Sequence, residues 1–186
     1  MLRNIALLVA AFLFAAPAIA VDVGGVKLDD KATVGGQELV LNGAGVRTKL
    51  MFKVYVGSLW VPAKAATAAA VYAKAPRRVQ LNMLRDVSAD QMIEALADGV
   101  KQGNSPADAA AVKAQTDQLA TILKSAGQLK EGNVLAFDFA DGATAVVLNG
   151  ATKGAIPGEA FNKALLNAWL GDNPVQADLK KAMLGG

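Results

Sequence analysis

The chain has 186 residues, which suits one domain and is short for two. Hydrophobic residues make up 53 % of it and charged residues 19 %, which excludes an intrinsically disordered chain because ample apolar side chain is present to bury. The formal net charge of +3 is a mild excess, so nucleic-acid binding is not expected. Cysteine and histidine are absent, which excludes disulfides, thiolate nucleophiles, Cys/His zinc sites and imidazole bases.

The first segment, Met1 to Ala20, has the layout of a cleavable secretory signal. Arg3 supplies positive charge, an apolar stretch too short to span a bilayer follows, and Pro17 breaks that stretch. Ala18-Ile19-Ala20 then offers the small-x-small pattern that signal peptidase needs. We therefore predict cleavage after Ala20, a single mature domain over 21–186, a periplasmic location and no transmembrane segment after cleavage. The alternative is an uncleaved N-terminal anchor.

The first part of the mature chain is rich in β-forming segments. Short strands are predicted at Val21–Val23, Val26–Leu28 and Glu38–Leu41. Asn42-Gly43 is interpreted as a turn, because this dipeptide is a strong turn signal. The β-branched and aromatic run from Val46 to Val61 then predicts one long strand.

The middle of the chain alternates between helical and strand patterns. The Ala-rich segment Ala63–Ala73 predicts a short helix, and the alternation in Val79–Leu84 predicts a half-buried strand. Ser88-Ala-Asp-Gln91 is a capping box that opens a helix with an apolar stripe including Met92. A further helix is predicted from Ser105-Pro106 to Gly127.

The last third begins with a hairpin and ends in helices. Asn133–Phe139 and Ala143–Leu148 flank Asp141-Gly142, the best hairpin signal in the chain. A helix then ends at Gly171, and Asn173-Pro174 is predicted to cap a last helix that runs through Met183. Strands first and helices afterwards predict an α+β domain with a largely antiparallel sheet and helices on one face.

Residues that could carry chemistry are few. Arg47 could bind a carboxylate or phenolate through a planar bidentate contact, or could be a solvated charge at an edge. Tyr55 could donate a phenolic hydrogen bond to a ligand, or could pack with its hydroxyl satisfied. Gly43-Ala-Gly45 fits neither a dinucleotide fingerprint nor a phosphate loop, so turn chemistry is the better interpretation.

Other polar clusters are predicted to be ordinary surface. Glu94 and Asp98 share a helix face, but nothing nearby completes a coordination shell, so no metal site or cofactor is predicted. Trp60 and Trp169 are interpreted as core residues. A basic cluster around Pro76 is interpreted as a solvated face; its members are Lys74, Arg77, Arg78 and Arg85.

Several of these segments together resemble the chalcone isomerase-like family, and more closely its bacterial, signal-bearing branch. The resemblance covers the mature chain and is most specific in Gly43-Ala-Gly-Val-Arg47 followed by the Tyr55–Trp60 strand. It is also carried by Leu84-Arg-Asp-Val-Ser and by Ala164-Leu-Leu-Asn-Ala-Trp-Leu-Gly. It implies an open-faced β-sandwich, in which a large antiparallel sheet carries helices on one face and a cleft lies between them.

The resemblance also implies roles for single residues. Arg47 matches the arginine that stabilises phenolate and enolate charge in the isomerases of the family. The catalytic threonine position falls at Tyr55, or at Val54 after a one-residue slip, while the tyrosine and asparagine positions become Met92 and Gly99. Keeping the arginine without those partners implies binding rather than turnover.

We therefore expect a non-catalytic protein that holds a fatty acid or a similar small amphipathic anion. Arg47 would pair the carboxylate, with Tyr55 and Met92 beside it, in an apolar cleft with one oriented charge. One alternative is a weak intramolecular lyase of the chalcone–flavanone isomerase type, in which Arg47 and Tyr55 polarise a carbonyl. The other is a structural or interaction domain whose cleft is filled by its own side chains.

Overall fold

The computed structural model describes residues 20–73 and 75–186, so the predicted signal segment lies, except for Ala20, outside the described residues. The strands are β1 (Val21–Val23), β2 (Val26–Leu28), β3 (Lys31–Val34), β4 (Gln37–Lys49), β5 (Phe52–Val61), β6 (Arg77–Met83), β7 (Val134–Ala140), β8 (Ala143–Leu148) and β9 (Ala151–Pro157). The helices are α1 (Ala68–Tyr72), α2 (Ala89–Gly103), α3 (Pro106–Ala111), α4 (Lys113–Ala126), α5 (Glu159–Leu170) and α6 (Ala177–Met183).

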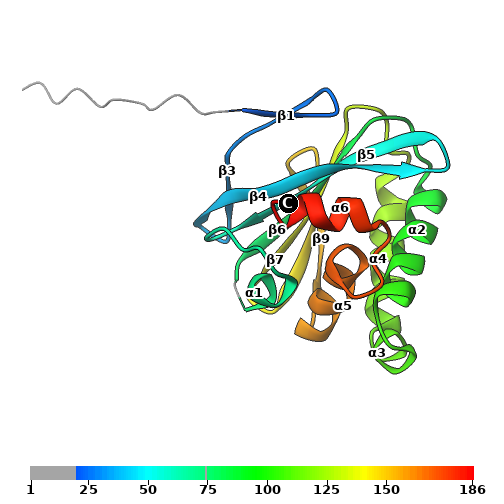
Figure 1. Ribbon diagram of the computed structural model, residues 1–186. Helices are drawn as coiled ribbons and strands as arrows, with labels where there is room; N and C mark the ends of the chain where they lie inside the picture. The colour runs from blue at the N-terminus through cyan, green and yellow to red at the C-terminus, as the bar shows by residue number, and fades with distance from the viewer. Residues whose placement is uncertain (1–19, 74) are drawn as a thin grey trace, which may run out of the picture.

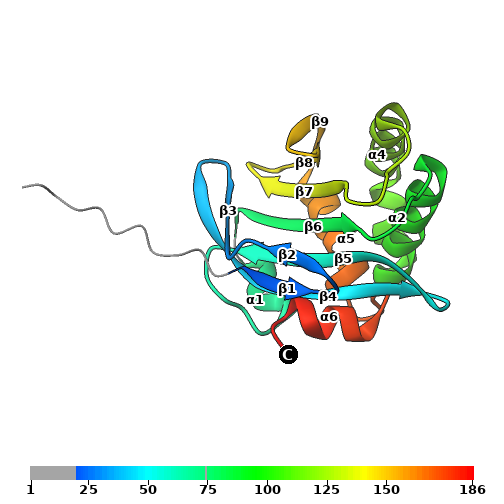
Figure 2. The same ribbon diagram turned by 90° about the horizontal axis from the view of Figure 1, so that it is seen from above.

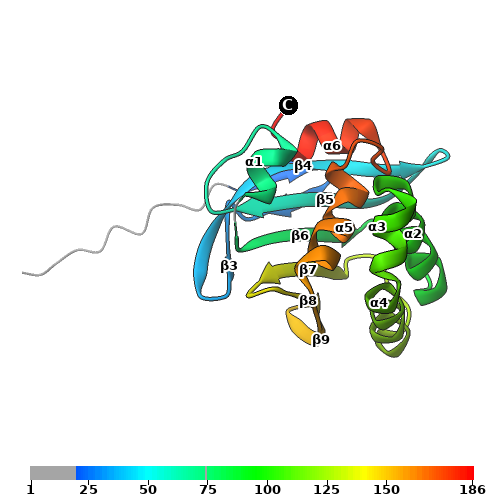
Figure 3. The same cartoon turned by 90° about the horizontal axis from the view of Figure 1, so that it is seen from below.

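Strands β3 to β9 form one seven-stranded antiparallel sheet in which the spatial order equals the chain order. The helices gather on one face of this curled sheet (Figures 1 and 3). Between them lies the main core, where the rings of Phe137 on β7 and Trp169 on α5 pack with centroids 5.9 Å apart. The predicted α+β fold, with helices layered on one face of an antiparallel sheet, is confirmed.

A second, smaller core covers part of the opposite face. The β1–β2 hairpin lies across β4 and β5 there, as the view from above shows (Figure 2). Leu39, Val56 and Trp60 are buried beneath it. Alternate residues of β5 therefore serve the two cores in turn, as the period of two along a strand requires.

Several local predictions are confirmed. Ser88 caps α2, with its hydroxyl accepting from the Gln91 amide and the Gln91 side chain accepting from the Ser88 amide. Asp141-Gly142 forms the turn between β7 and β8. The exposed Glu94 and the exposed Asp98 are surface charges on α2. No helix in the described ranges is long and apolar enough to cross a membrane.

The region around Asn42-Gly43 differs from the prediction. This dipeptide lies inside β4, and the predicted single strand from Val46 to Val61 is two strands, β4 and β5, joined by a turn at Leu50-Met51. Glycine is present at 43 because α6 packs directly on this strand: a Cβ on Gly43 would lie 2.1 Å from the carbonyl oxygen of Ala182. The interpretation of Gly43-Ala-Gly45 as turn chemistry is therefore wrong, since the absence of side chains at Gly43 and Gly45 leaves space for α6 to pack on β4.

The remaining differences concern weak patterns. Strands β3 and β9 were not predicted; they are the two edges of the sheet and bury few side chains, so they lack a clear apolar alternation. The predicted helix over Ser105–Gly127 is broken at Val112, whose backbone leaves the helical region while its side chain is buried. Only Ala68–Tyr72 of the segment predicted as helix over Ala63–Ala73 is helical. The last helix, predicted to start at Asn173-Pro174, begins at Ala177 and has Gln176 at its N-cap.

Candidate functional site

The three residues predicted to bind a ligand surround one small cavity between the sheet and the helices. Arg47 on β4 pairs across the sheet with Tyr55 on β5, so the two side chains leave the same face side by side. Met92, in the first turns of α2, closes the cavity from the helix layer. The cavity has a volume of about 60 Å³. Its other walls are mostly apolar and include Val54, Leu96, Ala168, Trp169 and Val175.

The Arg47 guanidinium is held by the segment that leads into α6. Its Nη1 donates to Gln176 Oε1 at 3.2 Å and to the Thr48 carbonyl oxygen. Gln176 also accepts from the Thr48 amide at 2.9 Å and donates to the Val46 carbonyl at 3.1 Å, so it pairs with β4 much as a neighbouring strand would. These bonds use one of the three guanidinium nitrogens, and the five donors of an arginine suffice for a bound carboxylate as well.

The Tyr55 hydroxyl is buried beside this guanidinium. It accepts a hydrogen bond of 3.1 Å from Trp169 Nε1, and burial raises the pKa of Tyr55, while the Trp169 bond and the Arg47 charge act in the opposite direction. Tyr55 is therefore a neutral phenol near neutral pH, with its own proton available for donation. Trp169 was predicted only as core, and here it also orients the hydroxyl; the sequence pattern of α5 does not distinguish these roles.

A larger groove adjoins the small cavity and leads to the surface. It has a volume of about 320 Å³ and extends between β5 and α2 to the β4–β5 turn, where Leu50 and Phe52 line it. The cavity and the groove share five lining residues: Lys49, Val54, Tyr55, Met92 and Ala95. The cavity alone has room for a few water molecules, whereas the groove is of the size usual for small-molecule sites.

The helix face opposite Arg47 has apolar or absent side chains at the two positions where the family resemblance implies a tyrosine and an asparagine in an isomerase. Position 92 is a buried methionine, and position 99 is a glycine packed against α5. A Cβ on Gly99 would lie 2.9 Å from the Ala168 Cβ and 3.1 Å from Val175 Cγ1, so an asparagine side chain has no space there. The site can bind and neutralise an anion, but it offers few groups to move protons.

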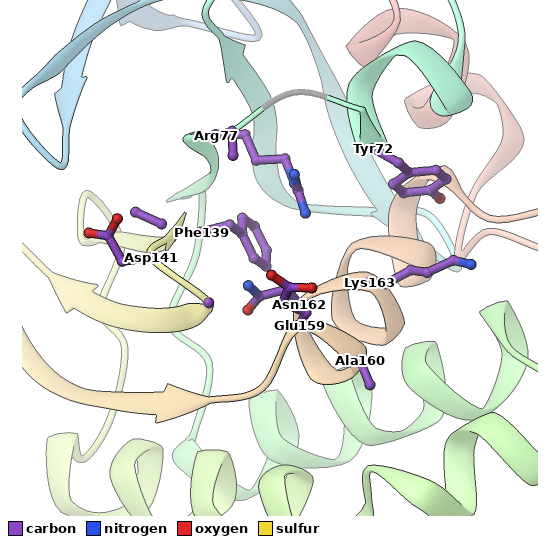
Figure 4. Close-up of a pocket in the computed structure, with 11 residues that line it drawn as sticks. Tyr72, Arg77, Phe139, Asp141, Glu159, Ala160, Asn162 and Lys163 are labelled. Atoms are coloured by element: carbon purple, nitrogen blue, oxygen red, sulfur yellow. The ribbon is translucent and has the colours of Figure 1, made fainter.

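A second cavity, of about 410 Å³, lies at the other end of the sheet and was not predicted (Figure 4). Arg77 from the start of β6 points between Phe139 and Tyr72, with its guanidinium carbon 5.5 Å from the Phe139 ring centre. Burial lowers the pKa of Arg77, while the Glu159 carboxylate acts in the opposite direction. Asp141 points outward (Figure 4). Basic and acidic groups are balanced here, so this cavity has less preference for an anion than the first.

The basic cluster around Pro76 is not a solvated face, contrary to the prediction. Arg77 is only 9 % exposed, and Arg78 forms two hydrogen bonds of 2.6 and 2.8 Å with the Asp138 carboxylate across the sheet. Arg85 is exposed and stacks on Phe52. Lys74 lies outside the described residues. Strand pairing separates the cluster, because neighbouring residues of β6 leave opposite faces of the sheet.

Tyr72 in the second cavity gives the fold a dependence on alkaline pH. Partial burial raises the pKa of Tyr72 from 10.0 to about 12. Its stabilising contribution is complete below pH 10 and is lost as the pH rises towards 12, because the unfolded chain loses this proton first. We expect the free energy of unfolding to fall by about 1 kcal/mol over this range, after allowance for solvent screening of a half-exposed group.

Urea unfolding at several pH values between 9 and 12 measures this dependence. Tyr72→Phe also removes a hydrogen bond to Asn167, so it lowers stability at every pH, but it should make the alkaline slope shallower. The slope does not vanish, because burial also raises the pKa of Tyr55. An unchanged alkaline slope in Tyr72→Phe would contradict the attribution of this pH dependence to the raised pKa of Tyr72.

The described chain combines a seven-stranded antiparallel sheet, helices on one face of it, and an arginine-containing cavity between these two layers. In the described part of the chain, no group of three or more acidic side chains could hold a metal ion. Residues 20–185 match the model of the chalcone isomerase-like family, and the chain belongs to that family.

Among solved structures, the fold is similar to that of a fatty-acid binding protein from Arabidopsis thaliana. The TM-score is 0.66 at 10 % sequence identity, over 86 % of this chain and 92 % of the plant chain. At this identity the likeness concerns the fold. No curated protein sequence matches the chain.

Proposed function

We propose that this protein binds a fatty acid, or a similar amphipathic anion, without transforming it, and that it does so in the periplasm after cleavage at Ala20. The observation that carries the proposal is the meeting of Arg47, Tyr55 and Met92 in one cavity that continues into a groove lined by both apolar and charged side chains. The plant protein of similar fold, described as a fatty-acid binding protein, supports the choice of ligand. The signal-like segment supports the location.

The carboxylate lies at the closed end of the site. One oxygen accepts from guanidinium nitrogens of Arg47 other than the Nη1 that bonds Gln176, and the Tyr55 hydroxyl donates to the other. Because Tyr55 stays protonated, it contributes a donor rather than a repelling charge. The acyl chain passes Met92 and Val54 and leaves along the groove towards Phe52. Such a site combines apolar walls with a few oriented polar groups.

Titration calorimetry with laurate at neutral pH tests this arrangement. We expect binding of one laurate per chain, and Arg47→Gln to weaken it by about tenfold or more, since hydrogen bonds to charged groups contribute about 1.5–3 kcal/mol. Tyr55→Phe keeps the ring and loses one donor, so a smaller loss is expected. Lys153→Gln, an exposed position on β9, is the matched loss of one positive charge and should bind as the unaltered protein does.

Two other functions make different predictions for the same samples. A lyase would bleach a chalcone in an absorbance assay and lose that activity in Arg47→Ala; we expect no bleaching above buffer, because positions 92 and 99 offer no side-chain donor. A structural domain with a closed cleft would bind neither laurate nor palmitate. The small volume beside Arg47 is the observation that favours this alternative. Equal laurate binding by Arg47→Gln would contradict the proposed role of the arginine.

A further inference from the structure

The turn between β4 and β5 exposes three large apolar residues in a row. Leu50 is 92 % exposed, Met51 84 % and Phe52 55 %. Within the described residues, Val21 is the only other large apolar side chain in this class. The hairpin tip projects beyond the rest of the sheet at the end of the molecule where α2 lies (Figures 1 and 2). Three adjacent apolar side chains on a projecting tip are unfavourable in water unless something covers them.

The turn residues themselves do not suit the turn. Leu50 has a φ of +57°, a left-handed conformation that favours glycine. The other tight hairpin turns among the described residues follow that preference, with glycine or a polar residue followed by glycine; they are Gly24-Gly25, Gly35-Gly36, Asp141-Gly142 and Asn149-Gly150. At Leu50-Met51 the chain instead places apolar side chains in a strained turn. Leu50 and Met51 therefore gain little burial from the fold of their own chain.

Basic side chains surround this apolar tip. Lys49 and Lys53 are exposed directly before and after it, and the Arg85 guanidinium lies 4.9 Å from the centre of the Phe52 ring. The acidic residues of the adjoining groove are Asp86, which accepts from the Glu131 amide at 2.8 Å, and the exposed Glu94 on α2. An apolar point flanked by three cations complements a bilayer that carries anionic headgroups.

We propose that the β4–β5 tip docks on an anionic lipid membrane, with Leu50 and Met51 inserted below the headgroups and the flanking lysines paired with phosphates. A membrane suits this tip better than a protein partner, since three side chains on a convex turn are far smaller than a standard protein interface. Leu50 and Phe52 also line the groove, so docking places the groove mouth at the bilayer surface. A role of this position in taking up lipid rests on the proposed fatty-acid binding. The docking itself does not.

Flotation with lipid vesicles tests the docking without any fatty acid. The protein used is the purified chain, with its start at Val21 verified by mass, and the vesicles are pure phosphatidylcholine or a mixture of phosphatidylcholine with 30 % phosphatidylglycerol. We expect binding to the mixed vesicles that high salt weakens, and little binding to the neutral ones. Lys53→Gln should weaken binding to the mixed vesicles by about fivefold, the effect of one cation at such a surface.

Variants of the turn separate docking from folding and from ligand binding. Leu50→Gly with Met51→Asn gives the turn a glycine where φ is positive, so it should fold at least as well and lose vesicle binding. Met51→Asn, which lies outside the cavity and groove linings, should lose most vesicle binding and keep laurate binding in solution. Met51→Trp should show a blue-shifted emission with mixed vesicles. Equal binding to both vesicle types, no effect of Met51→Asn, no shift in Met51→Trp, or tip-dependent dimers without vesicle binding would each overturn the proposal.

Discussion

Replacing Gly43 by alanine is expected to lower the free energy of unfolding by about 3 kcal/mol, the upper end of the usual effect of overpacking. The added Cβ would lie 2.1 Å from the carbonyl oxygen of Ala182 and 3.0 Å from the amide nitrogen of Gly185. Both are backbone atoms, so no side-chain rotation relieves the clash, and α6 must move away from β4. Chemical denaturation of the purified variant measures the loss.

Two other glycines on the same face provide graded controls. A Cβ on Gly45 would lie 2.8 Å from the Ala182 Cβ, and one on Gly57 would have its nearest contacts at 3.3 Å. We therefore expect Gly43→Ala to cost most, Gly45→Ala less and Gly57→Ala least. Ala182→Gly removes the atom that opposes Gly45→Ala, so in a double-mutant cycle it should partly rescue that variant and leave Gly43→Ala unrescued. Equal costs for the three variants would contradict close packing of α6 as their cause.

This packing also matters to the proposed ligand site. Gln176, which holds the Arg47 guanidinium, immediately precedes α6, so the position of this helix on β4 and β5 sets the position of the amide. Gly43 and Gly45 on β4 thus influence the position of Arg47 indirectly, because they let α6 pack closely and α6 positions Gln176. They are placed in the sequence next to Arg47, but their effect passes through residues more than a hundred positions away.

The fold could be predicted from the sequence where a signal is local. The capping box of α2 and the Asp141-Gly142 turn depend on neighbouring residues, and both are found as predicted. The turn at Leu50-Met51 could not be predicted, because leucine does not favour the positive φ that Leu50 adopts there. Asn42-Gly43 was a false turn signal. The glycine is needed because α6, at the far end of the chain, packs directly on this part of β4.

The position of the candidate site's residues could be predicted to a similar degree. The family resemblance placed Arg47, Tyr55 and Met92, and the structure brings all three around one cavity. Gln176 has no local pattern that connects it with Arg47, and Trp169 has the same apolar spacing as any core residue of α5. The burial of Arg77 follows from which face of β6 it occupies, and composition alone does not give that face.

Asn42 carries the second large expected effect, because it joins three segments with one buried side chain. Its Nδ2 donates to the Ala65 carbonyl at 2.9 Å and to the Met183 carbonyl at 2.8 Å, while its Oδ1 accepts from the Ala65 amide at 2.7 Å. Asn42 is 3 % exposed, so water does not easily replace these bonds. We expect Asn42→Ala to destabilise the protein by about 3 kcal/mol, because several backbone groups lose their partners in the interior.

The same substitution should also have a local signature. The bond to Met183 fixes the end of α6, so hydrogen exchange in Asn42→Ala should accelerate in α6 more than in the central strands β5 to β7. Exposed Asn173 is the matched control, and Asn173→Ala should stay within about 0.5 kcal/mol of the unaltered protein. If Asn42→Ala loses less than about 1 kcal/mol and α6 keeps its protection, then packing on Gly43 and Gly45 holds the helix without the asparagine. If Gly43→Ala at the same time causes a large loss of stability, the packing of α6 depends on steric fit. Comparable losses in the two variants would show that α6 needs both the close packing on the glycines and the Asn42 hydrogen bonds.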